Sequence, residues 1–70
     1  MKITKIVYAV LDGSATMSGY FDSGQIRCFL YSHGKWIEDS CPDIATKAGV
    51  LSKSDFDKLF PGIGEPEWPS

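Results

Sequence analysis

The first part of the chain alternates apolar and polar positions with a period of two. β-Branched and aromatic side chains run through Ile3–Leu11, Thr16–Phe21, Ile26–Tyr31 and Trp36–Glu38, and the turn signals "DGSA", "DSGQ" and "SHGK" separate these runs. Glycine accepts the positive φ that tight hairpin turns require. The pattern therefore predicts four strands over residues 3–39, joined as an antiparallel meander.

After Ser40 the apolar spacing becomes helical. The stretch "SCPD" places Pro42 in the first turn of a helix that we expect to end at Gly49. A second box, "SKSD" at Ser52–Asp55, begins another helix that ends before Pro61. Its apolar stripe is Phe56, Leu59 and Phe60. Two short helices are predicted within residues 41–60.

These elements predict a single α+β domain at residues 1–61, followed by an irregular tail at residues 62–70. A chain of 70 residues has room for only one core. Two short helices make one layer, and one layer covers one face of a sheet. We therefore expect a four-stranded antiparallel β-meander with both helices packed on the same face.

Whether a hairpin loop has an even or an odd number of residues decides which side chains share a face of the sheet. We assume an even number in every loop. On that assumption one face is almost entirely apolar and forms the core under the helices: Ile6, Tyr8, Val10, Met17, Gly19, Phe21, Ile26, Cys28, Leu30 and Ile37. The opposite face carries an aromatic group around one arginine: Tyr20, Arg27, Phe29, Tyr31 and Trp36. This second face is left to water or to a partner.

An uncovered aromatic face is typical of a protein-binding surface. We expect Tyr31 and Trp36 to be the anchors, Arg27 the polar hot spot, and Tyr20 and Phe29 supporting contacts for a protein partner or for a second copy in a homodimer. Two other interpretations stay open. A Tyr31–Trp36 pair across two strands stabilises a hairpin without any partner, and the tail can shield this face if Trp68 folds back.

Charge and cysteine usage narrow the possible partners. Nine acidic and seven basic residues give a net charge of −2, which provides no attraction to nucleic acid or to an anionic membrane. The longest apolar run, Ile6–Leu11, is too short to cross a bilayer. Cys28 and Cys41 lack C-x-x-C spacing. We expect reduced thiols and a cytoplasmic protein, with a disulfide as the alternative.

The stretch "IATKAGV" followed by "SKS" resembles the helix-turn-helix headpiece of lactose-repressor-like bacterial regulators. The resemblance implies a DNA-binding protein that uses residues 43–60, with a corner at residues 48–50 and the second helix in the major groove. The sequence departs from the family where Leu51 separates the corner from the serine. Asp55 and Asp57 would then face the phosphates, which makes this the alternative function rather than the first.

Candidate catalytic residues lack the partners that their chemistry needs. "YFDSG" at Tyr20–Gly24 is similar to the aspartic-protease signature, but it also reads as an ordinary hairpin turn. His33 lies in a predicted turn, and Cys41 has no matching base. We expect no enzymatic activity, cofactor or metal. The sequence favours a non-enzymatic protein-interaction module, and small acidic chains of this kind are associated with accessory or inhibitory factors of phages and mobile elements.

Overall fold

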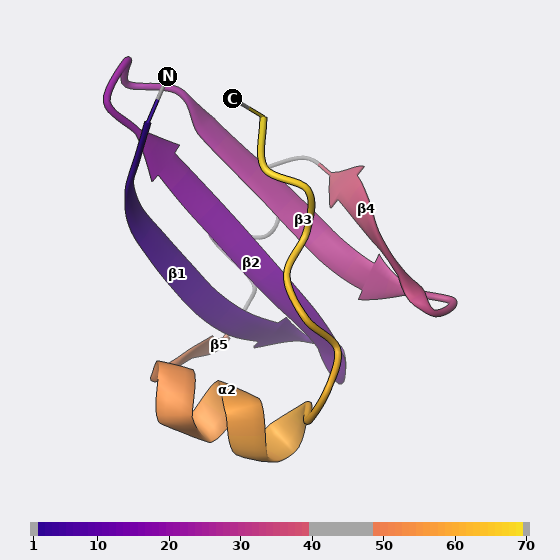
Figure 1. Ribbon diagram of the computed structural model, residues 1–70. Coiled ribbons are helices and arrows are strands. Elements are labelled where there is room, and N and C mark those ends of the chain that lie inside the picture. Colours follow the sequence, from indigo (N-terminus) through magenta and orange to yellow (C-terminus); the bar gives the residue numbers. More distant parts are fainter. Residues whose placement is uncertain (1, 40–48, 70) are drawn as a thin grey trace.

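A computed structural model describes residues 2–39 and 49–69 of the chain (Figure 1). Five strands form one antiparallel sheet in the spatial order β4-β3-β2-β1-β5, and a single described helix packs against it. The elements are β1 at Ile3–Leu11, β2 at Ser14–Phe21, β3 at Ile26–Ser32, β4 at Lys35–Asp39, β5 at Gly49–Leu51 and α2 at Lys53–Leu59. The predicted α+β class and the antiparallel meander are confirmed.

Two of the three hairpins turn through two residues with positive φ. Asp12 and Gly13 have φ of 50° and 81°, and His33 and Gly34 have φ of 53° and 80°. Positive φ at both positions is the type I′ geometry, whose twist matches that of the flanking strands. Because each of these loops has an even number of residues, the side chains keep the faces expected from the sequence across them.

The middle hairpin turns through three residues. The Phe21 N–H donates to the Gln25 carbonyl and the Gly24 N–H donates to the Phe21 carbonyl, both at 2.9 Å, and Gly24 has φ of 90°. This is the three-residue hairpin loop in which the last residue is left-handed. An odd loop reverses the faces of everything that follows it, so that Met17 lies opposite Phe29 rather than Cys28.

The sequence-based assignment of the β3 and β4 side chains to the two faces of the sheet is therefore wrong. Arg27, Phe29, Tyr31, Trp36 and Glu38 lie on the same face as Met17, which is the face that α2 packs against. The residues expected in the core from these two strands, Ile26, Cys28, Leu30 and Ile37, lie on the opposite face. The first hairpin was assigned correctly, because Tyr8 pairs with Met17 and Val10 with Ala15.

The second half contains an unexpected strand. Gly49–Leu51 pairs with Tyr8–Val10 of β1, where the sequence had predicted a helix end and a helix-turn-helix corner. Those two predictions are wrong for Gly49 and Val50. The helix predicted after Ser52 is confirmed, because the Ser52 hydroxyl accepts a hydrogen bond from the Asp55 N–H at 3.1 Å and caps α2. The helix predicted over residues 41–48 lies outside the described residues.

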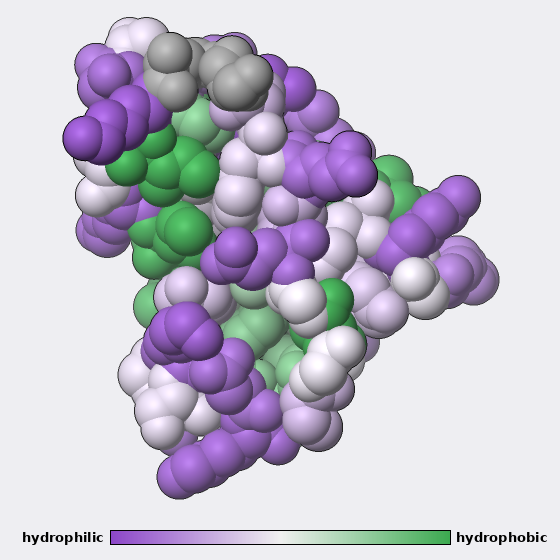
Figure 2. Space-filling view, in the orientation of Figure 1, coloured by the Kyte–Doolittle hydropathy of each residue, from purple (hydrophilic) through white to green (hydrophobic). Residues whose placement is uncertain are grey.

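The core lies between the sheet and α2. Ala15, Met17 and Phe56 are buried at its centre, and the ring of Phe56 lies 5.2 Å from that of Tyr8 and 5.3 Å from that of Phe60. Leu59, expected in the helix stripe, is 57% exposed. Hydrophobic surface remains visible along the β1 side of the face that α2 packs against (Figure 2). Among the described residues no helix is long and apolar enough to cross a membrane.

Candidate functional site

The five predicted binding residues do not share one open surface. Arg27, Phe29, Tyr31 and Trp36 lie together on the helix-facing side of β3 and β4, whereas Tyr20 lies on the other face of the sheet. We call Phe29, Tyr31 and Trp36 the aromatic platform. Tyr31 and Trp36 are direct cross-strand partners with ring centroids 5.1 Å apart in an edge-to-face arrangement, as the hairpin interpretation predicted.

The tail lies over the aromatic platform. Residues 62–69 contain no helix or strand, and they run from the end of α2 across β2 and β3 (Figure 1). The ring of Trp68 lies edge-to-face on Phe29 with centroids 5.2 Å apart. The Trp36 indole N–H donates to the Ile63 carbonyl at 3.3 Å, and Pro66 is buried. The alternative in which Trp68 folds back is the one that the structure shows, so the expected exposed platform is a covered one.

Gly19 makes room for the tail. A Cβ atom built at this position would lie 2.7 Å from Cζ3 of Trp68, which is closer than nonbonded carbon atoms approach. Trp68 thus rests directly on the backbone of β2. Phe29 is only 8% exposed as a consequence of this packing and of its position in the sheet.

Arg27, the expected polar hot spot, is already paired within the chain. Its Nη2 donates to Glu38 Oε1 at 2.7 Å, and its Nε donates to Glu38 Oε2. The hydrogen bond from Arg27 lowers the pKa of Glu38, and the hydrogen bond to Glu38 raises the pKa of Arg27. Because both hydrogen bonds of this bidentate pair join β3 to β4, Arg27 helps to hold these two strands together. Its charge is already matched by Glu38 and is less accessible to a partner.

The other edge of the sheet carries a surface that the sequence did not single out. β5 pairs with β1 only from Tyr8 to Val10, and no described strand lies beside the first half of β1 on that side. A hollow of about 510 Å³ opens there. We call it the edge groove, and its lining is Lys5, Ile6, Val7, Tyr8, Ala9, Ser18, Tyr20, Val50, Leu51, Ser52 and Lys53.

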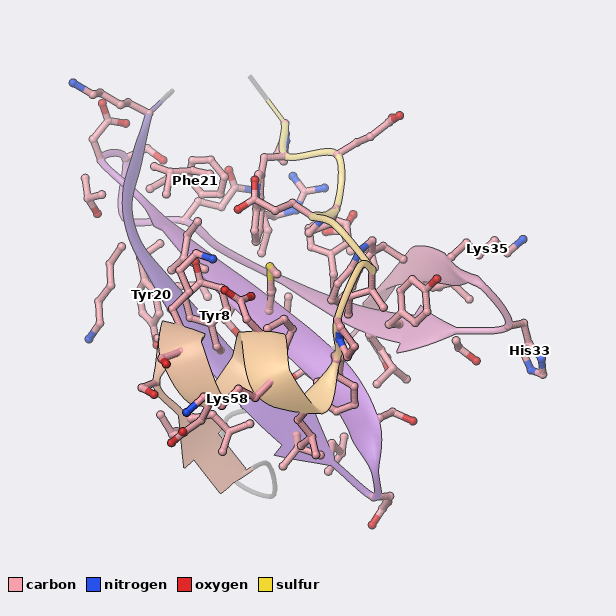
Figure 3. The ribbon with its side chains drawn as sticks, turned by 60° about the horizontal axis from the view of Figure 1, so that its bottom comes forward. Tyr8, Tyr20, Phe21, His33, Lys35 and Lys58 are labelled. Carbon is pink, nitrogen blue, oxygen red and sulfur yellow. The ribbon has the colours of Figure 1, made fainter. Side chains whose placement is uncertain are left out.

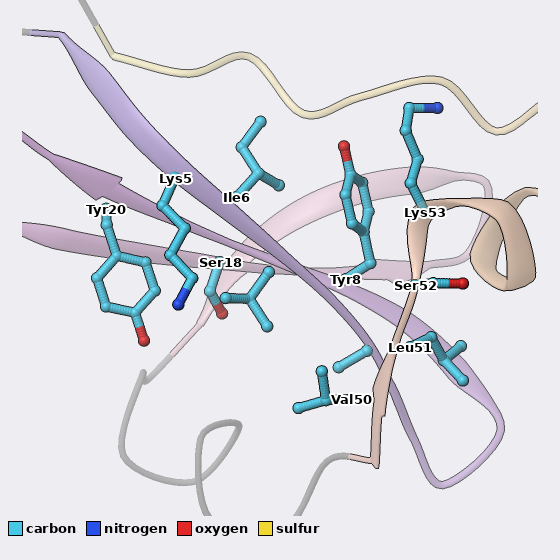
Figure 4. A pocket seen from close by; sticks show the side chains of 11 residues that line it. Lys5, Ile6, Tyr8, Ser18, Tyr20, Val50, Leu51, Ser52 and Lys53 are labelled. Carbon is cyan, nitrogen blue, oxygen red and sulfur yellow. The ribbon is translucent and has the colours of Figure 1, made fainter.

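The edge groove extends around β1 onto both faces of the sheet. Figure 4 shows Lys5, Ser18 and Tyr20 on one side of β1, with Tyr8 and Lys53 on the other. Val50 at its rim is 73% exposed, an apolar side chain with little cover. Backbone, apolar side chains and aromatic rings therefore line one continuous surface beside a strand edge that no described strand pairs with.

Two lysines give this groove a positive rim in a chain of net negative charge. Lys5 Nζ lies 5.6 Å from the centre of the Tyr20 ring, and Lys5 forms no ion pair with any described residue. Lys53 Nζ lies 5.9 Å from the Tyr8 ring and donates to Asp57 Oδ2 at 2.8 Å, a hydrogen bond that raises the pKa of Lys53. Lys5 is accordingly the better placed cation for an acidic ligand.

The candidate catalytic residues that the structure describes, Asp22 and His33, do not line either surface. Asp22, Ser23 and Gly24 form the middle hairpin turn, and the Asp22 carboxylate accepts from the Lys2 N–H at 3.1 Å. His33 lies at the tip of the β3–β4 hairpin, away from the helix (Figure 3). Within residues 2–39 and 49–69, no three of the histidine, cysteine, aspartate and glutamate side chains are grouped to hold a metal ion.

The expectation of reduced thiols is wrong for Cys28. It is buried on the face of β3 that points away from the tail, and it is disulfide-bonded. Cys41 lies outside the described residues. Disulfides persist mainly in oxidising compartments, so cysteine usage no longer supports the predicted cytoplasmic location.

The sequence contains one indication of the edge groove. The first strand of a meander is an edge strand by topology, and nine residues make β1 the longest strand here. β5 has three residues, so the rest of that edge of β1 has no partner strand among the residues that the structure describes. Comparisons of this chain with protein-family models, with curated proteins and with solved structures found no match.

Proposed function

We propose that this chain is a non-enzymatic protein-interaction module that binds an extended, acidic segment of a partner protein in the edge groove. The single observation that carries the proposal is that the first half of β1 pairs with no described strand on the side of β5, where it lies beside a groove lined by Val7, Tyr20 and Val50. An extended segment that adds to a sheet edge gains main-chain hydrogen bonds from the strand and specificity from flanking side-chain pockets.

The two edges of the sheet support this choice. β4, the opposite edge, carries charged residues at three of its five positions, Lys35, Glu38 and Asp39. Charged side chains on an edge strand discourage pairing with another chain. The half of β1 that has no described partner beyond it contains Ile6 and Val7 beside a single lysine, Lys5. This is therefore the edge that can accept a strand.

We infer an acidic ligand from the two lysines at the rim of the edge groove. Lys5 has no anionic partner among the described residues, and Lys53 lies on the other face of the same groove. A carboxylate near Lys5 would complete its charge pairing while the cation stays over the Tyr20 ring. This supports a segment with an acidic residue over one that is neutral or basic.

The DNA-binding alternative has less support. α2 exposes Asp55 and Asp57 along with its lysines, and Lys53 is paired with Asp57. The segment before it forms β5 instead of a helical corner. An accessory or inhibitory role of the phage type remains a finer version of the protein-binding proposal, in which the captured segment belongs to the protein being regulated.

The test uses two short synthetic peptides that alternate valine and threonine, one with a glutamate at each end and one with a lysine at each end. We expect the acidic peptide to bind about ten-fold more tightly in isothermal titration calorimetry, and Lys5→Glu to weaken it by about three- to ten-fold. Lys58→Glu in the last turn of α2 is the matched control, because Lys58 does not line the edge groove, and it should leave binding unchanged. Equal binding of both peptides, or an equal effect of both substitutions, would contradict the proposal.

A further inference from the structure

The face of β2, β3 and β4 that the tail covers has the features of a second peptide-binding site. Beside the tail lies a trough of about 530 Å³, and its walls include Tyr31, Trp36 and Lys35 on the sheet side and Pro66 on the tail side. This trough is separate from the edge groove, because its described lining comes from β3, the β3–β4 turn, β4 and the tail.

The tail shows what kind of ligand this face accepts. Pro66 is buried between exposed Glu65 and Glu67, and two residues after Pro66 the indole of Trp68 rests on Gly19 and Phe29. Rings of the platform supply flat apolar walls of the sort that hold proline-containing extended segments. The seated sequence is therefore an irregular segment with the pattern proline, any residue, tryptophan, and with acidic flanks.

The tail fits this face imperfectly. The Trp68 indole nitrogen is buried and has no hydrogen-bond partner in the part of the chain that the structure describes. A buried N–H without an acceptor weakens the state that contains it. The Trp36–Ile63 hydrogen bond, at 3.3 Å, is longer than the usual N–H···O distance. A ligand that offers an acceptor to the indole would bind better than the tail does.

The tail is also joined to the fold by a segment that can reorient. Gly62 and Gly64 have φ of 76° and 71°, and both positions are exposed. Positive φ at glycine carries little strain, and glycine also allows other backbone conformations. The residues after Gly64 can therefore leave the platform while α2, which ends at its cap Phe60, and Ile63, which packs against the core, stay in place.

We propose that the aromatic platform and Gly19 form a binding site for an acidic Pro-x-Trp segment of a partner protein, and that the tail is its resident, displaceable ligand. A partner segment of this kind would compete with residues 66–68 for Gly19 and Phe29. The predicted anchors Tyr31 and Trp36 would then contact a partner only after the tail has left. The proposal does not depend on the edge groove.

The experiment measures binding of a labelled synthetic peptide with the tail sequence, "GIGEPEWPS", to full-length variants by fluorescence anisotropy. Trp68→Ala empties the site, so it should bind the peptide at least about ten-fold more tightly than the wild type does, since the wild-type tail competes. A peptide with alanine in place of its tryptophan should bind neither protein. The double variant Gly19→Ala with Trp68→Ala is the matched control and should not bind, because its new Cβ occupies the place of the indole.

Trp68→Leu covers the case in which Trp68→Ala fails to fold, and it should bind the peptide with intermediate affinity. The proposal is overturned if a folded variant with Trp68 replaced does not bind the peptide, or if the Gly19→Ala control binds equally well. Failure of both Trp68 variants to fold would also overturn it, since the tail would then be a fixed part of the core. A dimer of the wild-type chain in analytical ultracentrifugation would assign the site to the tail of a second copy instead.

Discussion

At the β3 side of the sheet, aromatic rings pack on one another and are covered by the chain's own tail. At the β1 side, aromatic rings lie beside lysines at an edge that no described strand covers. β3 is held on both faces, by Trp68 against Phe29 on one and by the Cys28 disulfide on the other. The first half of β1 has β2 on one side and no described strand on the other. The presence of aromatic rings therefore does not by itself identify a binding surface. It also matters whether another part of the chain covers them.

The largest expected difference between the two regions is in stability. Trp68→Ala should lower the free energy of unfolding by about 3 kcal/mol, because it removes a large ring from Gly19 and Phe29. Tyr20→Ala at the edge groove is the matched aromatic deletion and should cost about 1 kcal/mol or less. Urea denaturation followed by circular dichroism measures both. Equal losses would mean that the two regions are equally part of the core.

Reduction of the disulfide at Cys28 should have the next largest effect on stability. Reduction should lower the free energy of unfolding by about 2–4 kcal/mol, since the link restricts the unfolded chain. A thiol assay on the denatured, unreduced protein should find no free thiol. Free thiol at Cys28 would restore the argument for a reducing compartment.

Gly19→Ala tests the closeness of the tail to the sheet. The added methyl group would lie 2.7 Å from the Trp68 ring, so the ring must move, and we expect a loss of about 1–3 kcal/mol. Gly49→Ala on β5 is the control, because its Cβ would meet Val10 Cγ1 at an ordinary 3.8 Å. Thermal melts of the two variants should separate clearly, and coincident melts would show that Trp68 does not rest on β2.

The Arg27–Glu38 pair should give the smallest effect, and one that depends on pH. The pKa of Glu38 is lowered in the folded state, so its contribution is present above the ordinary carboxylate pKa and is lost as the pH falls through the folded value. Wild type and Glu38→Gln should therefore differ in stability at neutral pH and converge in acid. The pair is exposed, so the difference should be small. A difference that persists in strong acid would assign it to packing instead of charge.

Local patterns predicted most of the fold. Ile3–Leu11 was predicted to the residue, and the Ser52 cap and the two type I′ turns follow from short-range chemistry that the sequence spells out. The face of β3 could not be predicted in the same way. "DSGQ" permits loops of either parity, and one residue in the loop turns over every side chain that follows. The wrong parity placed Phe29 outside, although the pairing of Tyr31 with Trp36 was correct.

The candidate site was harder to predict than the fold. β5 has only three residues, too few for a period to be read, and its pairing with β1 depends on contacts distant in sequence. The edge groove exists because β5 is short and α2 begins directly after it. Its lysines, Lys5 and Lys53, are 48 positions apart in the chain, and no local pattern joins them.

The most direct measurement is a two-dimensional amide NMR titration of the full-length protein with the acidic valine–threonine peptide. We expect chemical-shift changes to concentrate at Lys5, Val7 and Val50, and the signals of Phe29 and Trp36 to stay unchanged. The amides of Ile3–Val7 should exchange with solvent more slowly in the complex. Shifts centred on Phe29 and Trp36, or spread equally over both regions, would contradict the proposal.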